Sequence, residues 1–236
     1  MAGIELRNVW KSYVVENRVL PVLNGINLKV PKNCITIILG RSGCGKTTLL
    51  RLAGGLEKAD EGEIVADASY KTAFVFQEPR LMPWLNVWDN VRFGLKKQEQ
   101  DAVFIQSIIC MVGLQGFEKA YPDQLSGGMQ QRTAIARAFA YRPSFIMMDE
   151  PFAALDYFTR EQLQKELLHL QSEDGVSILF VTHSIDEALL LGDKIIVMEG
   201  GLVKAEFLVE VNHAERNLLE PEFISMKKEI IKQLDL

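Results

Sequence analysis

Residues 35–50 read ITIILGRSGCGKTTLL, and this stretch decides the fold of the chain. An apolar, β-branched run comes first, closely spaced glycines follow, and the segment then continues into TTLLRL, which favours a helix. The order strand, glycine-rich loop and helix matches the pattern G-x-x-x-x-G-K-[ST], which binds phosphate groups. Roughly one random chain in a hundred of this length would contain the bare pattern, so the flanking strand and helix are what argue against a chance match.

The residue types in this loop explain why it binds anions. Glycine has no Cβ, so backbone N–H groups can point into the loop. Together with the positive N-terminus of the helix, they form an anion cradle. Lys46 can reach the outer phosphates of a nucleotide, and the Thr47 hydroxyl can ligate Mg²⁺. The predicted nucleotide-binding residues here are Gly40, Arg41, Ser42, Gly43, Cys44, Gly45, Lys46, Thr47 and Thr48.

Size and composition restrict the classes of function. The chain has 236 residues and a formal net charge of −5, so broad binding to nucleic acid has no electrostatic support. The three cysteines at 34, 44 and 110 have no paired spacing, which favours a reducing, cytoplasmic setting over a disulfide framework. No apolar run approaches the ~20 residues that span a bilayer, and the first twenty residues contain several charges. We therefore expect a soluble chain that works at a membrane only by docking on another protein.

Strand and helix patterns alternate along most of the chain, which predicts an α/β fold, while helices dominate between residues 80 and 121. The predicted strands span residues 4–16, 18–30, 35–39, 61–66, 72–76, 145–149, 177–181, 194–198 and 202–211. The predicted helices span residues 49–56, 87–95, 101–112, 127–141, 159–170, 185–191 and 221–234.

Two acidic residues follow one of the predicted buried strands. Asp149 and Glu150 come after the apolar run 145–148, at the strand end where sites in α/β sheets lie. Asp149 is placed to hold Mg²⁺ through water, and Glu150 is placed to activate an attacking water molecule. Adjacent acids after a strand are often only a solvated turn, but the phosphate loop in the same chain favours the functional interpretation.

Gln77 and His183 follow two further predicted strands. A lone glutamine or histidine in such a place is often structural. For His183 the two interpretations are balanced, because Ser184 and Glu187 form a capping box that places the histidine at a strand–helix junction.

The stretch Leu125–Arg132, LSGGMQQR, indicates a second anion-binding helix start. Ser126 can cap a helix that begins at Gly127 or Gly128, and the glycines leave the helix N-terminus open to an anion. The alternative is an ordinary helix cap that two glycines happen to follow.

Two aromatic segments have no decisive interpretation from the residues alone. Tyr13 could stack on a base, but a half-buried strand tyrosine is the more common case. The apolar loop Met82–Leu85 could meet a partner protein or cover the core of its own segment.

These motifs together resemble the ATP-binding cassette (ABC) subunit of a membrane transporter, and the resemblance covers essentially the whole chain. LSGGMQQR is the specific element, because phosphate loops occur in many families. The other motifs follow in family order: Tyr13 as the adenine-stacking aromatic, Gly40–Thr47, Gln77, Asp149 with Glu150, the turn that ends at Asp156, and His183. The segments 75–91, 120–132, 149–167 and 181–198 resemble the nitrate, sulfonate and taurine importer branch.

The resemblance implies a fold and a domain plan. The fold is a RecA-like phosphate-loop core sheet with an antiparallel β subdomain and an inserted α-helical subdomain. Residues 1–77 and 141–211 would form the nucleotide-binding core, 78–140 the helical subdomain and 212–236 a tail helix. Two departures from the family stand out: Arg41 and Thr47 replace the usual Pro and Ser, and the segment 62–73 is shorter than usual.

The resemblance also implies a mechanism. Two copies face each other head to tail, with ATP and Mg²⁺ between the phosphate loop of one copy and the signature of the other. Lys46, Glu150 and His183 would be catalytic, and Thr47, Gln77 and Asp149 would be the metal site. The residues that the family assigns to ATP outside the phosphate loop are Tyr13, Gln77, Ser126, Gly127, Gly128, Gln130 and Asp156.

The implied partners are a second copy of the chain, an integral membrane permease and, indirectly, an extracytoplasmic solute-binding protein, with no nucleic acid. The implied place is the cytoplasmic face of the cell membrane. The main rival is a soluble ABC ATPase of DNA repair or translation, but this chain has neither a coiled-coil insertion nor a second cassette. A kinase or GTPase leaves LSGGMQQR unexplained, and the chain has no guanine-binding N-K-x-D motif.

Cys44 lies inside the phosphate loop, next to Gly45 and Lys46. A helix N-terminus and a nearby lysine lower the pKa of a thiol. We therefore expect Cys44 to be the most reactive of the three cysteines, although a buried, inert thiol packed under the loop is the alternative.

Overall fold

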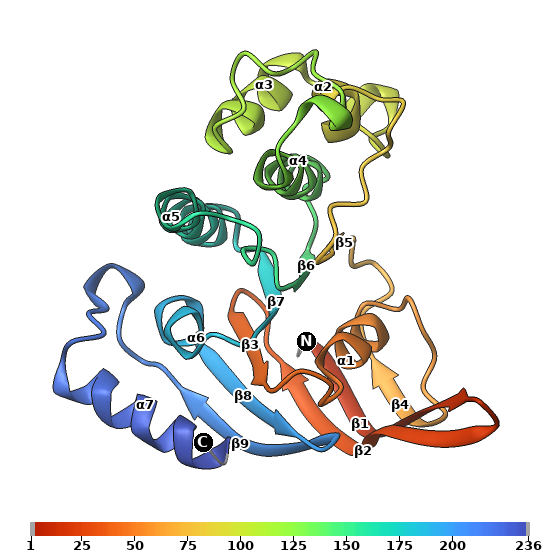
Figure 1. Ribbon diagram of the computed structural model, residues 1–236, viewed down its shortest axis with the longest axis vertical. Coiled ribbons are helices and arrows are strands. Elements are labelled where there is room, and N and C mark those ends of the chain that lie inside the picture. The colour runs from red at the N-terminus through yellow and green to blue at the C-terminus, as the bar shows by residue number, and fades with distance from the viewer. Residues whose placement is uncertain (1–2, 235–236) are drawn as a thin grey trace.

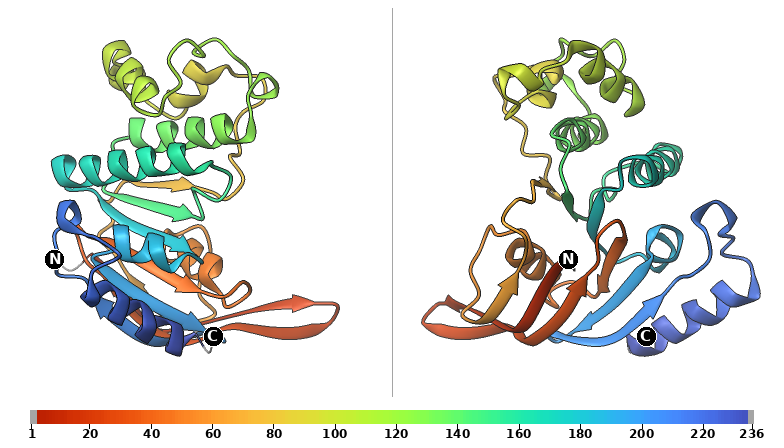
Figure 2. Two further views of the ribbon diagram at one scale, coloured as in Figure 1. Left: turned by 60° about the vertical axis from the view of Figure 1, so that its left-hand side comes forward. Right: turned by 180° about the vertical axis from the view of Figure 1, so that it is seen from behind.

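An antiparallel sheet and a larger mixed sheet form the lower half of the computed structural model, which describes residues 3–234 (Figure 1). The smaller sheet has the order β2 (Arg18–Val30), β1 (Ile4–Val15) and β4 (Glu61–Val65). The end of the β1–β2 hairpin projects away from the body of the molecule (Figure 2).

The larger sheet contains the strands that carry the predicted site. Four neighbouring pairs are parallel and the last pair is antiparallel. Its strands, in spatial order, are β5 (Thr72–Val75), β6 (Phe145–Asp149), β7 (Ser177–Thr182), β3 (Ile35–Gly40), β8 (Lys194–Glu199) and β9 (Leu202–Leu208). The central strands β3, β6 and β7 are buried along their whole length, as their mostly apolar sequences predict. The predicted α/β fold class is confirmed.

The two faces of the larger sheet bury separate apolar clusters. One face packs on α1 (Lys46–Ala53) and the smaller sheet, through Leu49 and Leu50 of the helix and Ile38 of β3. The other face packs on α4 (Gly127–Ala140), α5 (Tyr157–Asp174), α6 (Ile185–Leu191) and α7 (Pro221–Gln233). Because β3 has β7 on one side and β8 on the other, the loop that follows β3 leaves the sheet near its centre.

A helical layer stands above the sheets (Figure 1). It contains α2 (Val87–Val91), α3 (Ala102–Met111), short 3₁₀ helices at 97–99 and 122–124, and the start of α4. The predicted helix 87–95 is wrong beyond residue 91, where the backbone turns and Gly94 adopts a φ of +90°. The helix predicted over 159–170 is longer, because Asp156 caps its start and Gly175 ends it in the left-handed conformation.

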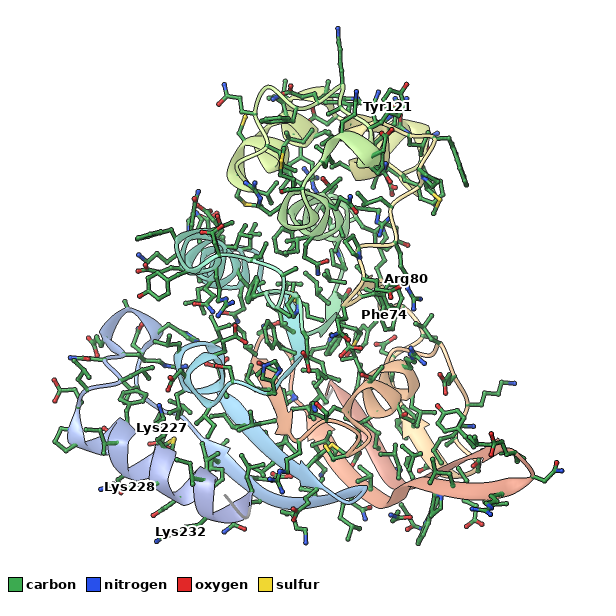
Figure 3. All side chains as sticks on the ribbon, in the orientation of Figure 1. Phe74, Arg80, Tyr121, Lys227, Lys228 and Lys232 are labelled. Atoms are coloured by element: carbon green, nitrogen blue, oxygen red, sulfur yellow. The ribbon has the colours of Figure 1, made fainter. Side chains whose placement is uncertain are left out.

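The predicted tail helix is confirmed as α7. Its apolar residues Phe223 and Ile230 are buried in the cluster that covers the larger sheet, and Leu234 after the helix joins them. Lys228 and Lys232 lie on the outer side of this helix (Figure 3), while Lys227 pairs with Asp186 of α6. Over residues 3–234 no helix combines the length and the apolar composition that a membrane span requires.

Candidate nucleotide-binding site

The phosphate loop joins the end of β3 to the start of α1, as the sequence predicts. Gly43 and Gly45 adopt φ values of +81° and +100°, which disfavour residues with a Cβ. A Cβ at Gly45 would also lie 2.8 Å from the Leu23 side chain. Helix α1 begins at Lys46, so its first backbone N–H groups have no partner within the helix and face the loop.

Lys46 is folded into the loop and only 6% exposed. Its Nζ donates to the carbonyl oxygens of Gly40 and Arg41, each at 2.9 Å. A buried ammonium held only by neutral carbonyls remains a strong site for an anion.

A pocket of about 380 Å³ lies against this loop, and we call it the phosphate pocket. It brings together Lys46 and Thr47 of the loop, Gln77 after β5 and Glu150 after β6. The complete lining is Val22, Ser42, Gly43, Gly45, Lys46, Thr47, Thr48, Gln77 and Glu150. Segments separated by more than 100 residues in the sequence therefore meet at the carboxyl ends of the parallel strands, where α/β folds place their sites.

Thr47 and Asp149 form the predicted metal-binding pair. The Thr47 hydroxyl donates to Oδ1 of Asp149 at 3.1 Å. Burial raises the pKa of the Asp149 carboxyl, while the hydrogen bond from Thr47 acts in the opposite direction. Among the described residues no group of three or more His, Cys, Asp or Glu side chains could hold a metal by itself. This donor set fits Mg²⁺, which keeps waters and phosphate oxygens in its shell.

Glu150 and His183 are neighbours. Glu150 Oε2 lies 3.1 Å from Nδ1 of the histidine, whose side chain is 62% exposed. The backbone at Glu150 has a φ of +45°, a conformation that few non-glycine residues adopt. Its N–H donates to the Val181 carbonyl of the adjacent strand at 3.0 Å, which fixes this turn. The strained turn aims the carboxylate at the phosphate pocket, and such strain concentrates at functional sites.

The segment around Gln77 is attached to α4. Nε2 of Gln131, in the middle of that helix, donates to the Phe76 carbonyl at 3.1 Å. Arg137, one and a half turns further on, donates to the Arg80 carbonyl at 3.0 Å. These hydrogen bonds attach the loop that carries Gln77 to α4, the helix that begins with the LSGGMQQR glycines.

Aromatic stacking holds the same loop to the core. The Arg80 guanidinium lies 4.0 Å from the centre of the Phe76 ring, which stacks on Phe74 with ring centres 5.5 Å apart. Phe74 in turn covers Gly54 at the end of α1, where a Cβ would come within 2.0 Å of the ring. Figure 3 shows Phe74 and Arg80 side by side where the helical layer meets the sheets.

The second predicted anion site begins α4. Ser126 caps the helix by accepting a hydrogen bond from the Met129 N–H at 3.3 Å. Gly127 faces open space, and a Cβ at Gly128 would lie 3.4 Å from Leu155. The Gln130 amide donates to the carbonyls at 122 and 125 and so holds the preceding turn. No residue of 126–130 is among the described residues that line the phosphate pocket, so one chain does not bring the two anion sites together.

Asp156 and Tyr13 occupy positions with clear structural partners. Asp156 caps α5 by accepting a hydrogen bond from the Thr159 N–H at 3.0 Å, and the hydrogen bonds from Thr159 lower the pKa of its carboxyl. Tyr13 is half-buried in β1, and its hydroxyl donates to Glu57. The nucleotide contacts of both residues stay predictions.

The expectation of a reactive Cys44 is wrong. The residue is only 7% exposed and belongs to the apolar cluster beneath α1. Burial raises the pKa of its thiol, and the effect of burial exceeds the opposing effect of Lys46. The backbone of Cys44 remains part of the loop, but its sulfur packs under the loop and not into the phosphate pocket.

Sequence reasoning missed Val22 and Glu57. Val22 lines the phosphate pocket from β2, and no motif marks it, because its place follows from the pairing of β2 with β1. Glu57 lies just after α1 and became notable only through its contact with Tyr13. In the loop 82–85, Met82 and Leu85 are half-buried and Trp84 is 70% exposed, and its contact with a partner protein stays a prediction.

Comparison with known proteins identifies similar chains. The family described as ABC transporter matches residues 23–153. An uncharacterized ABC transporter ATP-binding protein of Methanocaldococcus jannaschii is 41% identical over 243 residues, which cover 98% of this chain and 91% of that protein. The aliphatic sulfonates import ATP-binding protein SsuB of Bacillus cereus is 38% identical over 240 residues, which cover 98% of this chain and 96% of that protein.

Solved structures agree with these matches. The dimeric structure of a post-hydrolysis state of an ATP-binding cassette, bound to ADP and Pi, superposes with a TM-score of 0.81 at 34% sequence identity. The superposition covers 89% of this chain and all of that chain.

Proposed function

The chain belongs to the ABC transporter family, and from this premise we propose how its residues bind and hydrolyse ATP to drive the import of a small organic anion. It is an ABC ATPase of the importer type. The observation that carries the residue roles is the phosphate pocket, where Lys46, Thr47, Gln77 and Glu150 converge from three separate segments.

Nucleotide binding rests on the phosphate loop. The N–H groups at the start of α1 would bind the phosphate oxygens. The Lys46 side chain would turn from the Gly40 and Arg41 carbonyls so that its ammonium binds the β- and γ-phosphates. Thr47, Asp149 and Gln77 would hold Mg²⁺ through the Thr47 hydroxyl, the Asp149 carboxylate and the Gln77 amide oxygen. When bound, Mg²⁺ neutralises charge that develops on the phosphates.

Hydrolysis uses Glu150 and His183. The Glu150 carboxylate accepts a hydrogen bond from the attacking water and orients it toward the γ-phosphate. His183, 3.1 Å from Glu150, reaches the same phosphate from the neighbouring strand end. The positive φ at Glu150 and the hydrogen bond from its N–H to the Val181 carbonyl fix the backbone from which the carboxylate extends.

A second copy of the chain completes the site. Ser126, Gly127 and Gly128 lie away from the phosphate pocket of their own chain, so they serve the γ-phosphate of the partner copy. The dimeric cassette structure that resembles this chain supports the arrangement. ATP would close the dimer and hydrolysis would open it, which shifts the population of two states of the assembly.

Transport requires a permease that is not part of this chain. The importer named among the relatives carries aliphatic sulfonates, so we assign this chain to the cytoplasmic face of a membrane permease for a sulfonate-like anion that an extracytoplasmic binding protein delivers. The exposed Trp84 and its loop, which Asn90 of α2 holds through the Met82 N–H and the Leu85 carbonyl, supply the surface that meets the permease.

Hydrolysis and solute are tested separately. Purified chain should hydrolyse MgATP, and Lys46→Ala should lose both binding and turnover, because the only ammonium of the loop is gone. In cells that lack this chain, uptake of a labelled alkanesulfonate should fall and should return with the wild-type gene but not with Lys46→Ala. If the deletion strain takes up sulfonate normally while the purified protein hydrolyses ATP, the proposed solute is wrong. The assignment as an ATPase is then unaffected.

A further inference from the structure

A polar cluster links the strand that carries Tyr13 to the end of α1. The Tyr13 hydroxyl donates to Oε2 of Glu57. The other oxygen of the same carboxylate, Oε1, lies 3.3 Å from Nη1 of Arg51, in the last turn of α1. The Glu57 side chain is only 24% exposed. Each carboxylate oxygen therefore has its own partner, and the cluster is partly shielded from water.

The Tyr13 side chain needs such an anchor because of where it lies. Beyond Tyr13 the β1–β2 hairpin projects from the body of the molecule, and its Val14 and Val19 side chains are 73% and 70% exposed (Figure 2). An isolated two-stranded hairpin is marginally stable in water. The Lys11 ammonium lies 5.6 Å from the centre of the Tyr13 ring and is itself fixed by Asp60 at 2.8 Å. The hydroxyl of Tyr13 is thus held at the point where the hairpin leaves the core.

Helix α1 links the cluster to the phosphate pocket, because Arg51 lies in its last turn and Thr48, near its start, lines the pocket. Burial and the hydrogen bond to Glu57 raise the pKa of the Tyr13 phenol. Thr48 lines the phosphate pocket next to Lys46 and Thr47. Tyr13 itself is not among the described residues that line the phosphate pocket, so its place beside the base is taken from the proposed function.

We propose that Glu57 is a positioning residue for nucleotide binding, whose carboxylate holds the Tyr13 ring where it stacks on the adenine base. Arg51 holds the carboxylate in turn. Glu57 itself touches no part of the nucleotide. The inference rests on the proposed function, since it requires that ATP occupies the phosphate pocket and that Tyr13 receives the base.

The physical basis is preorganisation. A ring that is already ordered loses less rotamer entropy when a base stacks on it, so binding becomes tighter without a new contact. Removing the anchor should raise the dissociation constant for MgATP on the order of fivefold, which is within the usual entropy cost of immobilising one side chain on binding. Turnover of Glu57→Ala at saturating MgATP should stay within about twofold, because Glu57 touches no part of the nucleotide and the reacting phosphate is held elsewhere.

The experiment compares two ligands on the full chain. Isothermal titration calorimetry measures MgATP and magnesium tripolyphosphate, which has the phosphates but no base. The variants are Tyr13→Phe, which keeps the ring and removes only its hydroxyl, Glu57→Ala, and the double variant. Glu63→Gln, on the neighbouring strand and paired with Arg7 at 2.6 Å, is the matched control for loss of a surface charge.

We expect both single variants to bind MgATP more weakly to a similar extent, and the double variant to bind no more weakly than either, because both break the same hydrogen bond. Tripolyphosphate binding should be unchanged in all of them, and Glu63→Gln should match wild type with both ligands. Equal losses for the two ligands, additive losses, or wild-type MgATP binding by Tyr13→Phe would each overturn the role of Glu57. A wrong proposed function would give another result: if ATP does not bind in the phosphate pocket, Lys46→Ala should bind both ligands as well as the wild-type chain does.

Discussion

Glu150 Oε2 and His183 Nδ1 lie 3.1 Å apart, although 33 residues separate them in the chain. Glu150 lines the phosphate pocket and also a small cavity of about 110 Å³ that His183 and Arg160 share. The two side chains come from the ends of adjacent parallel strands, β6 and β7. Their contact therefore follows from strand order and does not require any local sequence signal.

The first prediction concerns the water-orienting role of Glu150. Glu150→Gln should reduce ATP turnover at least about a hundredfold, because an amide is a far weaker base than a carboxylate. ATP binding should persist, and ATP with Mg²⁺ should trap a dimer that size-exclusion chromatography detects. Glu161→Gln, an exposed residue on α5, is the control and should hydrolyse ATP normally. Near-normal turnover by Glu150→Gln would remove Glu150 from the catalytic site.

The second prediction concerns the stability cost of Asp149. Burial raises the pKa of its carboxyl above the ordinary value of 3.8. The folded state then holds the proton more tightly than the unfolded state, so the contribution of Asp149 to stability falls as pH rises through the window between 3.8 and the raised value. Asp149→Asn should therefore raise the melting temperature of the metal-free protein at pH 7, by roughly 2–4 °C if the relief is about 1 kcal/mol.

The sign of this effect has a matched control in Asp60. The Lys11 ammonium lowers the pKa of the Asp60 carboxyl, so Asp60 stabilises the fold above its ordinary pKa and this stability is lost as pH falls through the lowered value. Asp60→Asn should lower the melting temperature at pH 7, and Asp149→Asn should raise it. Melting curves at several pH values without Mg²⁺ test both. A lower melting temperature for Asp149→Asn at pH 7 would show that Thr47 and the nearby cations outweigh burial.

The third prediction concerns thiol reactivity. Cys110 is exposed and Cys44 is buried, and burial raises the pKa of the Cys34 and Cys44 thiols. Because the thiolate is the reactive form, Cys110 should label first with maleimide, and Cys44 should label slowest. Peptide mapping after brief labelling measures the order, and labelling in denaturant should equalise the three rates. Fast labelling of Cys44 in the folded chain would mean that the loop opens in solution.

The fourth prediction concerns action of the signature in the partner's site. Ser126→Arg should block hydrolysis by the dimer, because a bulky cation replaces the small cap next to Gly127. Monomer binding of MgATP should stay near wild type, since the phosphate pocket lies elsewhere. Ser126→Asn is the control, because asparagine caps helices as well as serine does. Loss of nucleotide binding by the Ser126→Arg monomer would contradict the assignment in trans.

Local sequence was sufficient wherever one short segment determines the geometry. The glycines at 43 and 45 require positive φ, and Lys46 and Thr47 follow at the start of a helix, so the loop could be read from consecutive residues. Ser126 was likewise predictable as the polar residue before α4, because a cap depends on the next three residues only, whereas the start predicted for α5 at residue 159 missed the cap at Asp156. These features involve short-range backbone hydrogen bonds, which sequence patterns describe well.

Tertiary structure decided what depends on strand order and on burial. Cys44 shows the limit most clearly: its neighbours in sequence predict a low pKa, yet its side chain packs into the apolar cluster under α1, and desolvation outweighs the nearby lysine. The contacts of Tyr13 with Glu57 and of Glu150 with His183 cross 44 and 33 residues. Such contacts arise from the packing of whole sheets and helices, so no spacing along the chain encodes them.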